Sequence, residues 1–394
     1  MATYGSWLAV KRYLTICKHL YPPPWVWDTP TMSPTPTPIS KLIPWITMNL
    51  GMITILISTI ILILHKIIGG SPNDPDFHHG VALVWGIVTA TSIIGTAISH
   101  FLASLNLEFC WWLGAGHNLS QRVNTRKFKQ KRWTNWKSDY IGIAMHLMIG
   151  TLLLGSSVGF IYPIVRHGDP CFFIFRTAGL APRAWWVKLL RSVIQGSIFV
   201  HGSLVYLGAM LPVWVGLSLL IKLIQSLSHP KNSRGSGPVK EYLNDKLIYD
   251  QLQILMFEGN KLVYYIAPIG FMMGMTLCIL LGSVVVAVDQ LPIGIKLECC
   301  LMWIGACTAT QVLFPFAAAV SKGSEQARKF WKVKKNQLLK WERKDVKCWR
   351  RIVVDVGPFF GIVNSTATTF LYHTMDNTAE LIIWLKFNYS GSTG

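Results

Sequence analysis

The chain has 394 residues, of which 51% are hydrophobic and only 14% are charged, and its mean hydropathy is +0.39. Soluble domains carry about 25% charged residues, so this composition excludes an ordinary soluble enzyme and indicates an integral membrane protein. The net charge of +19 does not indicate a nucleic-acid partner, because Lys and Arg alternate with long apolar segments and do not gather in one polar region.

The first part of the chain precedes any apolar segment of membrane length. Lys11, Arg12 and Lys18 follow the first apolar residues, whereas a signal peptide has its basic residues first. We therefore expect a short amphipathic helix in the cytoplasm at this end. The Pro-rich stretch 21–38 predicts a semi-rigid linker that does not pack as a domain. Together they form a predicted cytoplasmic N-terminal arm, 1–43.

A transmembrane helix needs about 20 predominantly apolar residues, and six segments meet this requirement. These segments predict a six-helix bundle within 44–320. They are 44–66, 80–104, 139–163, 192–222, 261–288 and 293–320. A seventh segment, 363–387, has the right length but carries polar side chains throughout. The predicted fold class is an all-α polytopic membrane protein with seven transmembrane helices.

The loops between these segments predict the orientation, because Lys and Arg are enriched on the cytoplasmic side of membranes. Of the 37 Lys and Arg, 29 lie in the N-terminal arm, 105–138, 222–261 and 321–351. The N-terminus is therefore predicted in the cytoplasm, with an extracellular C-terminal tail, 388–394, on a multi-pass protein of the cell membrane. The connection 164–191 disagrees, since it is external in this topology and yet basic. Its basic residues are Arg166, Arg176, Arg183, Lys188 and Arg191.

Motifs that could carry catalysis or bind a metal have plainer explanations. Residues Gly155–Gly159 match the G-x-S-x-G pattern, but they lie inside an apolar helix, where small residues allow neighbouring helices to approach. The adjacent His78 and His79 have no second coordinating pair. We therefore expect no enzymatic activity, no cofactor and no metal site.

The segment 321–362 predicts a basic amphipathic helix under the membrane that anchors the bundle and continues into the last span. On a wheel at about 100° per residue, its apolar and basic residues lie on opposite faces. The apolar face holds Phe330, Trp331, Leu338, Trp341, Cys348, Trp349 and Ile352, and the basic face holds Arg328, Lys329, Lys332, Arg343, Lys347 and Arg350. Such a helix either lies flat on anionic headgroups or packs against partner subunits. Pro358 and Gly361 allow a break before the last span.

The last segment, 363–387, carries its polar side chains on one face of a helix. The predicted pore-lining residues on that face are Ser365, Thr369, His373, Asp376 and Glu380. A charge that faces lipid costs about 2.5–3.5 kcal/mol, so this face must meet protein or water. Carboxylates at one mouth suit a cation-conducting pore, which several subunits would have to enclose. The alternatives are a helix buried within a monomer's bundle and a helix that does not span.

This layout resembles the arthropod gustatory and odorant receptor superfamily. The shared features are seven spans, a cytoplasmic N-terminus, a long basic last loop and a final helix that follows a Phe-rich turn. The gustatory receptors end in Thr-Tyr, about five apolar residues and Gln-Phe. Here Thr378-Ala379 is followed by six residues and Lys386-Phe387, so Tyr is Ala, Gln is Lys and the spacing is one residue longer. These departures indicate a divergent branch.

The resemblance implies a ligand-gated cation channel, formed by a homo- or hetero-tetramer, that serves as a chemosensory receptor. It implies a small organic ligand in the outer half of the helix bundle and seventh helices that line the pore. Aromatic residues with a few polar groups suit such a pocket, although an ordinary aromatic core is the alternative. The predicted ligand-binding residues are Trp85, Phe160, Tyr162, Phe199, His201, Tyr206, Met275 and Trp303.

Three other classes of membrane protein are alternatives to the channel. A G-protein-coupled receptor needs an external N-terminus and D-R-Y and N-P-x-x-Y motifs, none of which the sequence provides. A transporter has polar residues at the midplane in two related halves, whereas this chain concentrates them in one terminal helix. The transporter is the second choice, and an accessory membrane protein stays open.

The predicted topology has a direct test in glycosylation. Asn388 begins the sequon Asn388-Tyr389-Ser390 and Asn118 begins Asn118-Leu119-Ser120. We expect a glycan on Asn388 and none on Asn118, because only external asparagines meet the modifying enzyme. A gel shift that is lost on Asn388→Gln checks this. A glycan on Asn118 with none on Asn388 would invert the topology.

Overall fold

The computed structural model describes residues 4–28, 33–68, 76–77, 79–124, 139–228, 238–287, 293–334, 336 and 338–389. Of these described residues, 84% are helical. The helices are α1 (Tyr4–Leu20), α2 (Ile43–Ile68), α3 (His79–Ser104), α4 (Asn106–Asn124), α5 (Tyr140–Val165), α6 (Pro170–Thr177), α7 (Trp185–Ser228), α8 (Pro238–Val263), α9 (Ile266–Ala287), α10 (Ile293–Lys334), α11 (Lys340–Cys348) and α12 (Thr366–Tyr389), with a 3₁₀ turn η1 (Ile39–Lys41). Two antiparallel hairpins pair β1 (Trp25–Asp28) with β2 (Ser33–Pro36) and β3 (Asp355–Val356) with β4 (Phe360–Gly361). His78, most of the predicted tail and the side chains of His79 and Asn388 lie outside the described residues.

Six helices in the described part of the chain are long and apolar enough to cross a membrane, namely α2, α3, α5, α7, α9 and α10. They match the six predicted segments, although α7 and α10 extend beyond the predicted ends. The helix α12 has 24 residues, or about 36 Å at about 1.5 Å per residue, which exceeds the hydrocarbon thickness of about 30 Å. With α12 as the polar seventh helix, the protein has the predicted all-α polytopic architecture.

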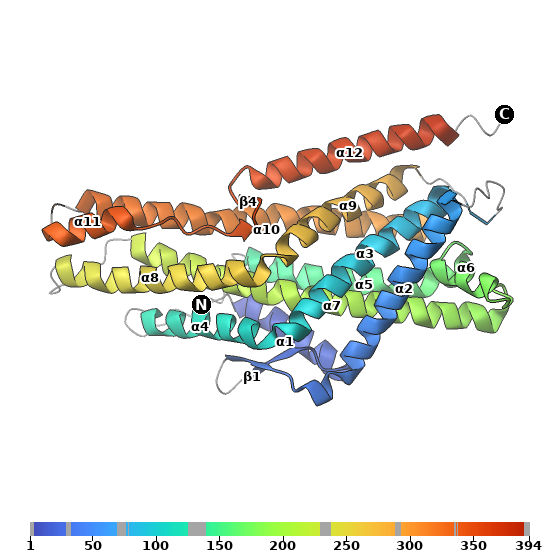
Figure 1. Ribbon diagram of the computed structural model, residues 1–394, viewed down its shortest axis with the longest axis horizontal. Helices are drawn as coiled ribbons and strands as arrows, with labels where there is room; N and C mark the ends of the chain where they lie inside the picture. The colour runs from blue at the N-terminus through green and yellow to red at the C-terminus, as the bar shows by residue number, and fades with distance from the viewer. Residues whose placement is uncertain are drawn as a thin grey trace.

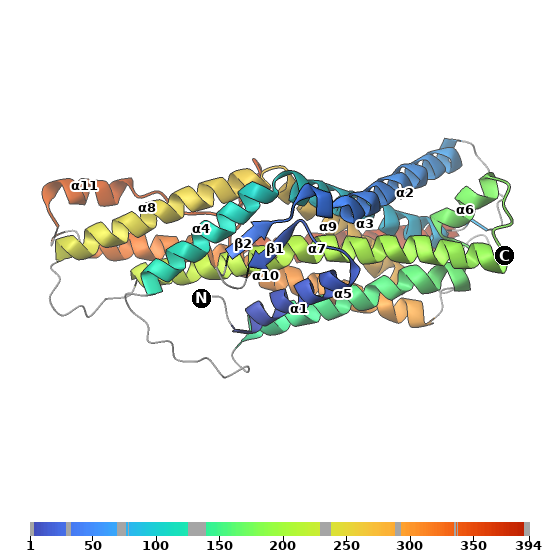
Figure 2. The ribbon, with the colours of Figure 1, turned by 90° about the horizontal axis from the view of Figure 1, so that it is seen from below.

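The helices run roughly along one long axis and give the molecule two halves (Figure 1). One half contains α2, α3, α6, α9 and α12, and the other contains α4, α8, α11 and the second part of α10. We call the two extremities the α6 end and the α11 end. The 44-residue α7 and the 42-residue α10 extend from one half into the other. Near the junction, α1 packs against α5 and α7, and the first hairpin packs against α4 (Figure 2).

The Pro-rich part of the N-terminal arm packs on the bundle, which corrects the expectation of an unpacked linker. Pro34 and Pro36 occupy alternate positions of β2. The N–H groups that donate to the other strand belong to the residues that alternate with the prolines. Thr37, for example, donates its N–H to the carbonyl of Pro24 at 2.9 Å. The prolines therefore remove no donor that the pairing needs. The hairpin buries Trp25, which is 1% exposed.

Trp25 compensates for a proline inside α7. Pro212 has no N–H, so the carbonyl of Gly208, four residues earlier, lacks its usual helical partner. The indole N–H of Trp25 donates to that carbonyl at 2.9 Å. One turn earlier, the hydroxyl of Tyr13 donates to the carbonyl of Leu204 at 3.1 Å. The N-terminal arm thus satisfies polar backbone that α7 exposes on its buried side.

The predicted amphipathic helix before the last span is not continuous. α10 ends at Lys334, and a new helix, α11, begins where the carboxylate of Glu342 accepts the backbone N–H of Leu339 at 2.9 Å. After α11 the chain turns at Gly357, whose φ is +54°, next to Pro358. Neither residue suits a helix interior. The chain therefore reaches α12 through the β3–β4 hairpin, and the break allowed by Pro358 is confirmed.

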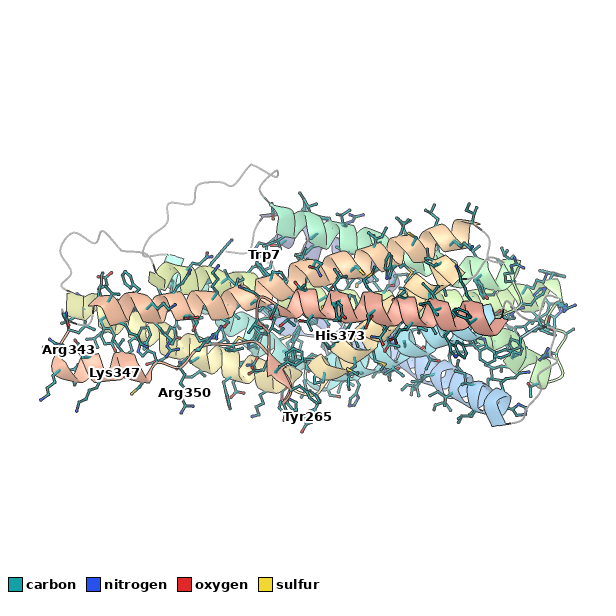
Figure 3. All side chains as sticks on the ribbon, turned by 90° about the horizontal axis from the view of Figure 1, so that it is seen from above. Trp7, Tyr265, Arg343, Lys347, Arg350 and His373 are labelled. Carbon is teal, nitrogen blue, oxygen red and sulfur yellow. The ribbon has the colours of Figure 1, made fainter. Side chains whose placement is uncertain are left out.

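The aromatic residues of this region form a cluster at the α11 end. The ring of Trp349 stacks on Tyr249 with centroids 4.3 Å apart, and Trp331 lies edge-on to Tyr242 at 5.3 Å. Basic side chains lie outside the cluster, as Figure 3 shows for Arg343, Lys347 and Arg350. Trp341 and Cys348, predicted on the apolar face, are exposed, because the break after α10 turns α11 away from the original helix register. The apolar stripe is therefore only partly buried.

Replacing Trp25 by Phe tests the interaction with α7. This change keeps an aromatic ring but leaves the carbonyl of Gly208 without a donor, which costs about 1–3 kcal/mol for a buried polar group. We expect a lower midpoint temperature of thermal unfolding for the purified protein in detergent. The double variant Trp25→Phe with Pro212→Ala regains a helical N–H and should recover much of the loss.

The matched control is Trp111→Phe, because Trp111 is 56% exposed on α4. It should unfold at the wild-type temperature. Equal midpoints for Trp25→Phe and wild type, or no recovery in the double variant, would contradict the role given to the indole N–H.

Candidate functional site

The helix α12 packs on α9 and α10 through one face. The side chains buried on that face are Thr366, Ala367, Phe370, Thr374, Thr378 and Leu385. The ring of Phe370 lies 5.2 Å from that of Phe271 on α9 and 5.5 Å from that of Phe314 on α10. Aromatic packing therefore fixes the first turns of α12 against both neighbours.

Two threonines in this packing face need no hydrogen-bond acceptor from the neighbouring helices. The hydroxyl of Thr374 donates to the carbonyl of Phe370 at 2.8 Å, and that of Thr378 donates to the carbonyl of Thr374 at 2.6 Å. Each hydroxyl therefore bonds back to its own helix, four residues earlier. With their protons used, the threonines present methyl groups, and the packing face is effectively apolar.

The five predicted pore-lining side chains are exposed; four lie on the other side of α12, and Ser365 directly precedes its first residue. The five are Ser365, Thr369, His373, Asp376 and Glu380. Figure 3 looks onto this side of the helix, where His373 is labelled. The hydroxyl-bearing residues lie near the middle of the molecule and the two carboxylates nearer the α6 end (Figure 1). The chain's own helices therefore leave the polar face uncovered.

Hydrogen bonds fix the point at which α12 starts. The hydroxyl of Thr366 accepts the backbone N–H of Val363 at 3.0 Å. In the preceding hairpin, the amide of Asn260 on α8 donates to the carboxylate of Asp355 at 2.7 Å and to the carbonyl of Val353 at 2.9 Å. The segment that leads into α12 is thus hydrogen-bonded to α8.

Two small cavities lie between the helices in the α6 half. The larger, of about 50 Å³, is lined by Val84, Ile87, Val88, Val158, Gly159, Tyr162, Gln195, Phe199, Leu281, Val284, Cys299 and Met302. The smaller, of about 10 Å³, is lined by Met52, Ile55, Val88, Thr91, Ser92, Gln195, Ile198 and Phe199. Val88, Gln195 and Phe199 belong to both linings, so they form the wall between the two cavities.

Two of the eight predicted ligand-binding residues, Tyr162 and Phe199, line these cavities. Trp85 is fully buried, and its indole N–H donates to the carbonyl of Gly168 at 2.8 Å. Phe160 covers Gly196, where an added Cβ would lie 2.3 Å from the Phe160 ring. These two aromatic residues therefore have structural contacts at the α6 end beside the cavities.

The other four predicted ligand-binding residues also lie outside the cavity linings. His201 is fully buried, and its Nδ1 lies 2.8 Å from the hydroxyl of Tyr21 in the N-terminal arm. Tyr206 and Met275 pack on the largest core cluster, and Trp303 packs on the cluster that includes Tyr162. Of the eight predicted residues, two therefore line the cavities and six do not.

Sequence reasoning missed Gln195, the most polar residue of the shared wall. It lies in α7, is 5% exposed, and its Oε1 has no hydrogen-bond partner among the described residues. The available signal was an amide within a membrane span, because polar groups at that depth are costly and often functional. An amide is not part of the aromatic pattern from which the ligand-binding residues were predicted.

The connection 164–191, which is basic although the predicted topology makes it external, lies at the α6 end. The guanidinium of Arg191 forms a salt bridge with Asp169, and both side chains are fully buried. Arg191 also donates to the carbonyl of Arg166 at 3.2 Å and to that of Pro182 at 2.9 Å. Asp169 in turn accepts the N–H of Phe172 at 3.0 Å and caps α6. One basic residue of this connection is therefore an internal tie between α5, α6 and α7.

His167 lies in the same connection, with its ring stacked on that of Phe172 at 5.3 Å. Burial lowers the pKa of His167, and the neighbouring Lys188 and Arg191 lower it further. The imidazole is therefore neutral near pH 7. The positive charge at this end comes from arginine and lysine, and titration of this histidine near neutral pH does not alter it.

No protein-family model matches the sequence, and no curated protein sequence matches it. Solved structures do match the fold, and among them are two of an insect olfactory receptor. The insect olfactory receptor OR5 from Machilis hrabei in complex with eugenol has a TM-score of 0.63, with 8% identity over 95% of this chain and 97% of that chain. The structure titled as OR5 alone has a TM-score of 0.58, with 9% identity over 83% of this chain and 87% of that chain.

This chain therefore has the insect olfactory receptor fold and is a multi-pass membrane protein. The resemblance inferred from the seven-span layout is confirmed at the level of the fold.

The buried ion pair gives a prediction about stability. Asp169→Asn keeps an oxygen that can cap α6 but leaves the guanidinium of Arg191 buried without a counter-ion. Breaking a buried pair in this way costs about 3–5 kcal/mol. We expect a clearly lower thermal unfolding midpoint in detergent, and partial recovery when Arg191→Met is added.

Arg183→Gln is the control, because Arg183 pairs with Asp76 at the same end but is 66% exposed. Exposed pairs contribute about 0–1 kcal/mol, so its midpoint should stay near that of the wild type. A shift of the same size for both variants would show that burial of the Asp169 pair has no special role.

Proposed function

We propose that this chain is a subunit of a ligand-gated cation channel that acts as a chemosensory receptor in the cell membrane. The observation that carries the proposal is the orientation of α12, which packs its apolar face on α9 and α10 and leaves its polar face exposed. In a bilayer each lipid-facing charge costs about 2.5–3.5 kcal/mol. Asp376 and Glu380 therefore require protein or water on that side.

In this proposal, further subunits cover the exposed polar face of α12. One helix cannot enclose a pore, whereas a closed ring of subunits presents the same face of every α12 to a common axis. We propose a tetramer, built from this chain alone or with a related chain. The resemblance to the odorant and gustatory receptors supports that number, and the exposed polar face supports the direction in which α12 points.

The order of residues along the proposed pore suits cations. Ser365 and Thr369 lie deeper and offer neutral hydroxyls, while Asp376 and Glu380 lie toward the α6 end. A ring of carboxylates at a pore mouth raises the local concentration of cations and disfavours anions. His373 lies between the two groups in sequence. The α6 end is the extracellular end in the proposed orientation.

We assign ligand binding to the two cavities in the α6 half, with Tyr162 and Phe199 as the predicted residues that line them. The OR5 structure contains eugenol, and we propose a small organic ligand here as well. Ligand pockets usually measure about 300–1,000 Å³, far more than the cavities provide. Binding therefore requires side chains of the shared wall, Phe199 above all, to move, and we propose that this movement biases α12 toward an open pore.

A transporter is the second candidate. Transporters of the inverted-repeat type place substrate at helices that are broken at the midplane. Here α5, α7 and α10 remain helical through Pro163, Pro212 and Pro315, which favours the channel. Purification in mild detergent separates the two: a tetramer supports the channel, and a monomer supports the transporter.

Neutralising both carboxylates tests the proposed pore. Asp376→Asn with Glu380→Gln preserves side-chain shape while it removes the negative field. We expect cation conductance to fall and cation preference over anions to weaken, most strongly at low ionic strength, where screening is least. Single-channel recording of the purified protein in planar bilayers at two salt concentrations measures this. Thr369→Leu should block current by drying the pathway.

Two controls accompany these variants. Glu108→Gln with Glu258→Gln removes the same charge from α4 and α8 and should leave conductance unchanged. Leu381→Val, on the packing side of α12, should do the same. If the double neutralisation and Thr369→Leu both conduct like the wild type, α12 lines no pore.

A further inference from the structure

The amide oxygen of Gln195 has no hydrogen-bond partner in the part of the chain that the structure describes. Its side chain is 5% exposed, and its Oε1 is buried without a partner among the described residues. Leaving a buried amide oxygen unpaired is costly, more so at membrane depth. A position held at such a cost is a candidate for contact with something the chain itself does not supply.

The surroundings of Gln195 explain why its amide oxygen stays unpaired. It faces the larger cavity, whose wall is almost entirely aliphatic, sulfur-containing or aromatic. On the other side, the smaller cavity brings Thr91, whose hydroxyl oxygen is also buried without a partner. Two polar groups without partners thus border cavities that are otherwise apolar. This arrangement matches the general make-up of a ligand site, an apolar wall with a few polar groups that fix orientation.

Phe199 stands next to Gln195 on the same face of α7. Residues four apart in a helix are neighbours, and both side chains belong to the linings of both cavities. Movement of the Phe199 ring would therefore join the cavities at the point where the amide lies. A ligand body that occupies the larger, apolar cavity would then have its polar end at Gln195.

We infer that Gln195 accepts a hydrogen bond from the ligand, so the ligand class is a small apolar molecule that carries one hydroxyl or N–H donor. The inference rests on the proposed ligand-binding function and adds the chemistry of the ligand to it. Sites that hydrogen-bond a ligand hydroxyl discriminate against analogues without it, because the buried acceptor is left unpaired. A matched ether should therefore bind about tenfold more weakly than the phenol or alcohol, the ratio that one net hydrogen bond supports.

The test compares eugenol with its O-methyl ether, and several small alcohols with their methyl ethers. Dissociation constants are measured on the full-length protein in detergent, and currents are recorded from the same protein in bilayers. We expect the wild type to bind the hydroxyl member of a pair about tenfold more tightly. Gln195→Leu should weaken binding of the hydroxyl member and leave the ether almost unchanged, so that the preference disappears.

Gln253→Leu is the matched control, because Gln253 lies on α8 and donates to the carbonyl of Arg350 at 2.9 Å, far along the chain from the cavities. It should keep the wild-type preference. A wild type that binds both members equally, or that binds none of the probes, overturns the inference, as does a preference that persists in Gln195→Leu. Binding with the expected preference but without any channel current would support the ligand chemistry and contradict the proposed channel.

Discussion

The inability of a bilayer to solvate polar groups is the constraint on which this structure depends. Within the hydrocarbon region a backbone carbonyl, hydroxyl or charge must find its partner in protein or in enclosed water. The helix α12 meets this constraint in two ways. Thr374 and Thr378 bond to their own helix, which frees one face to pack, whereas Asp376 and Glu380 point away from the bundle. One side of α12 therefore packs within the chain, whereas the other side needs protein or water from outside it.

The constraint also explains the N-terminal arm. Because of Pro212 in α7, the carbonyl of Gly208 lacks its helical donor. Trp25, in the first hairpin, supplies a donor from a distant part of the chain. A proline in a membrane helix is tolerated when such a donor is present. Gln195, in the same helix, is the contrasting case. Nothing in the described chain pairs with its Oε1, and it borders a cavity.

The α11 end ties α12 to the long helix α10. The hydroxyl of Tyr249 lies 2.7 Å from that of Ser324 on α10 and donates to the carbonyl of Arg350 at 2.7 Å, and Ser324 accepts the N–H of Ile352. The returning chain is thereby fixed to α8 and α10 before α12 begins. Burial and the neighbouring Asp345 raise the pKa of Tyr242, so that its hydroxyl stays protonated and donates to Asp345.

The sequence alone determined the helical spans, because bilayer thickness demands about 20 apolar residues, and it determined the polar face of the last helix, because helical periodicity is local. It also placed a break at Pro358, where proline chemistry is local too. Only tertiary structure decided which way the face of Asp376 turns, that the Pro-rich arm packs, and that Tyr162 and Phe199 meet Gln195 at a cavity while His201 bonds to Tyr21. Those outcomes depend on contacts between segments far apart in the chain, and local periodicity carries no information about which distant side chain will supply a missing partner.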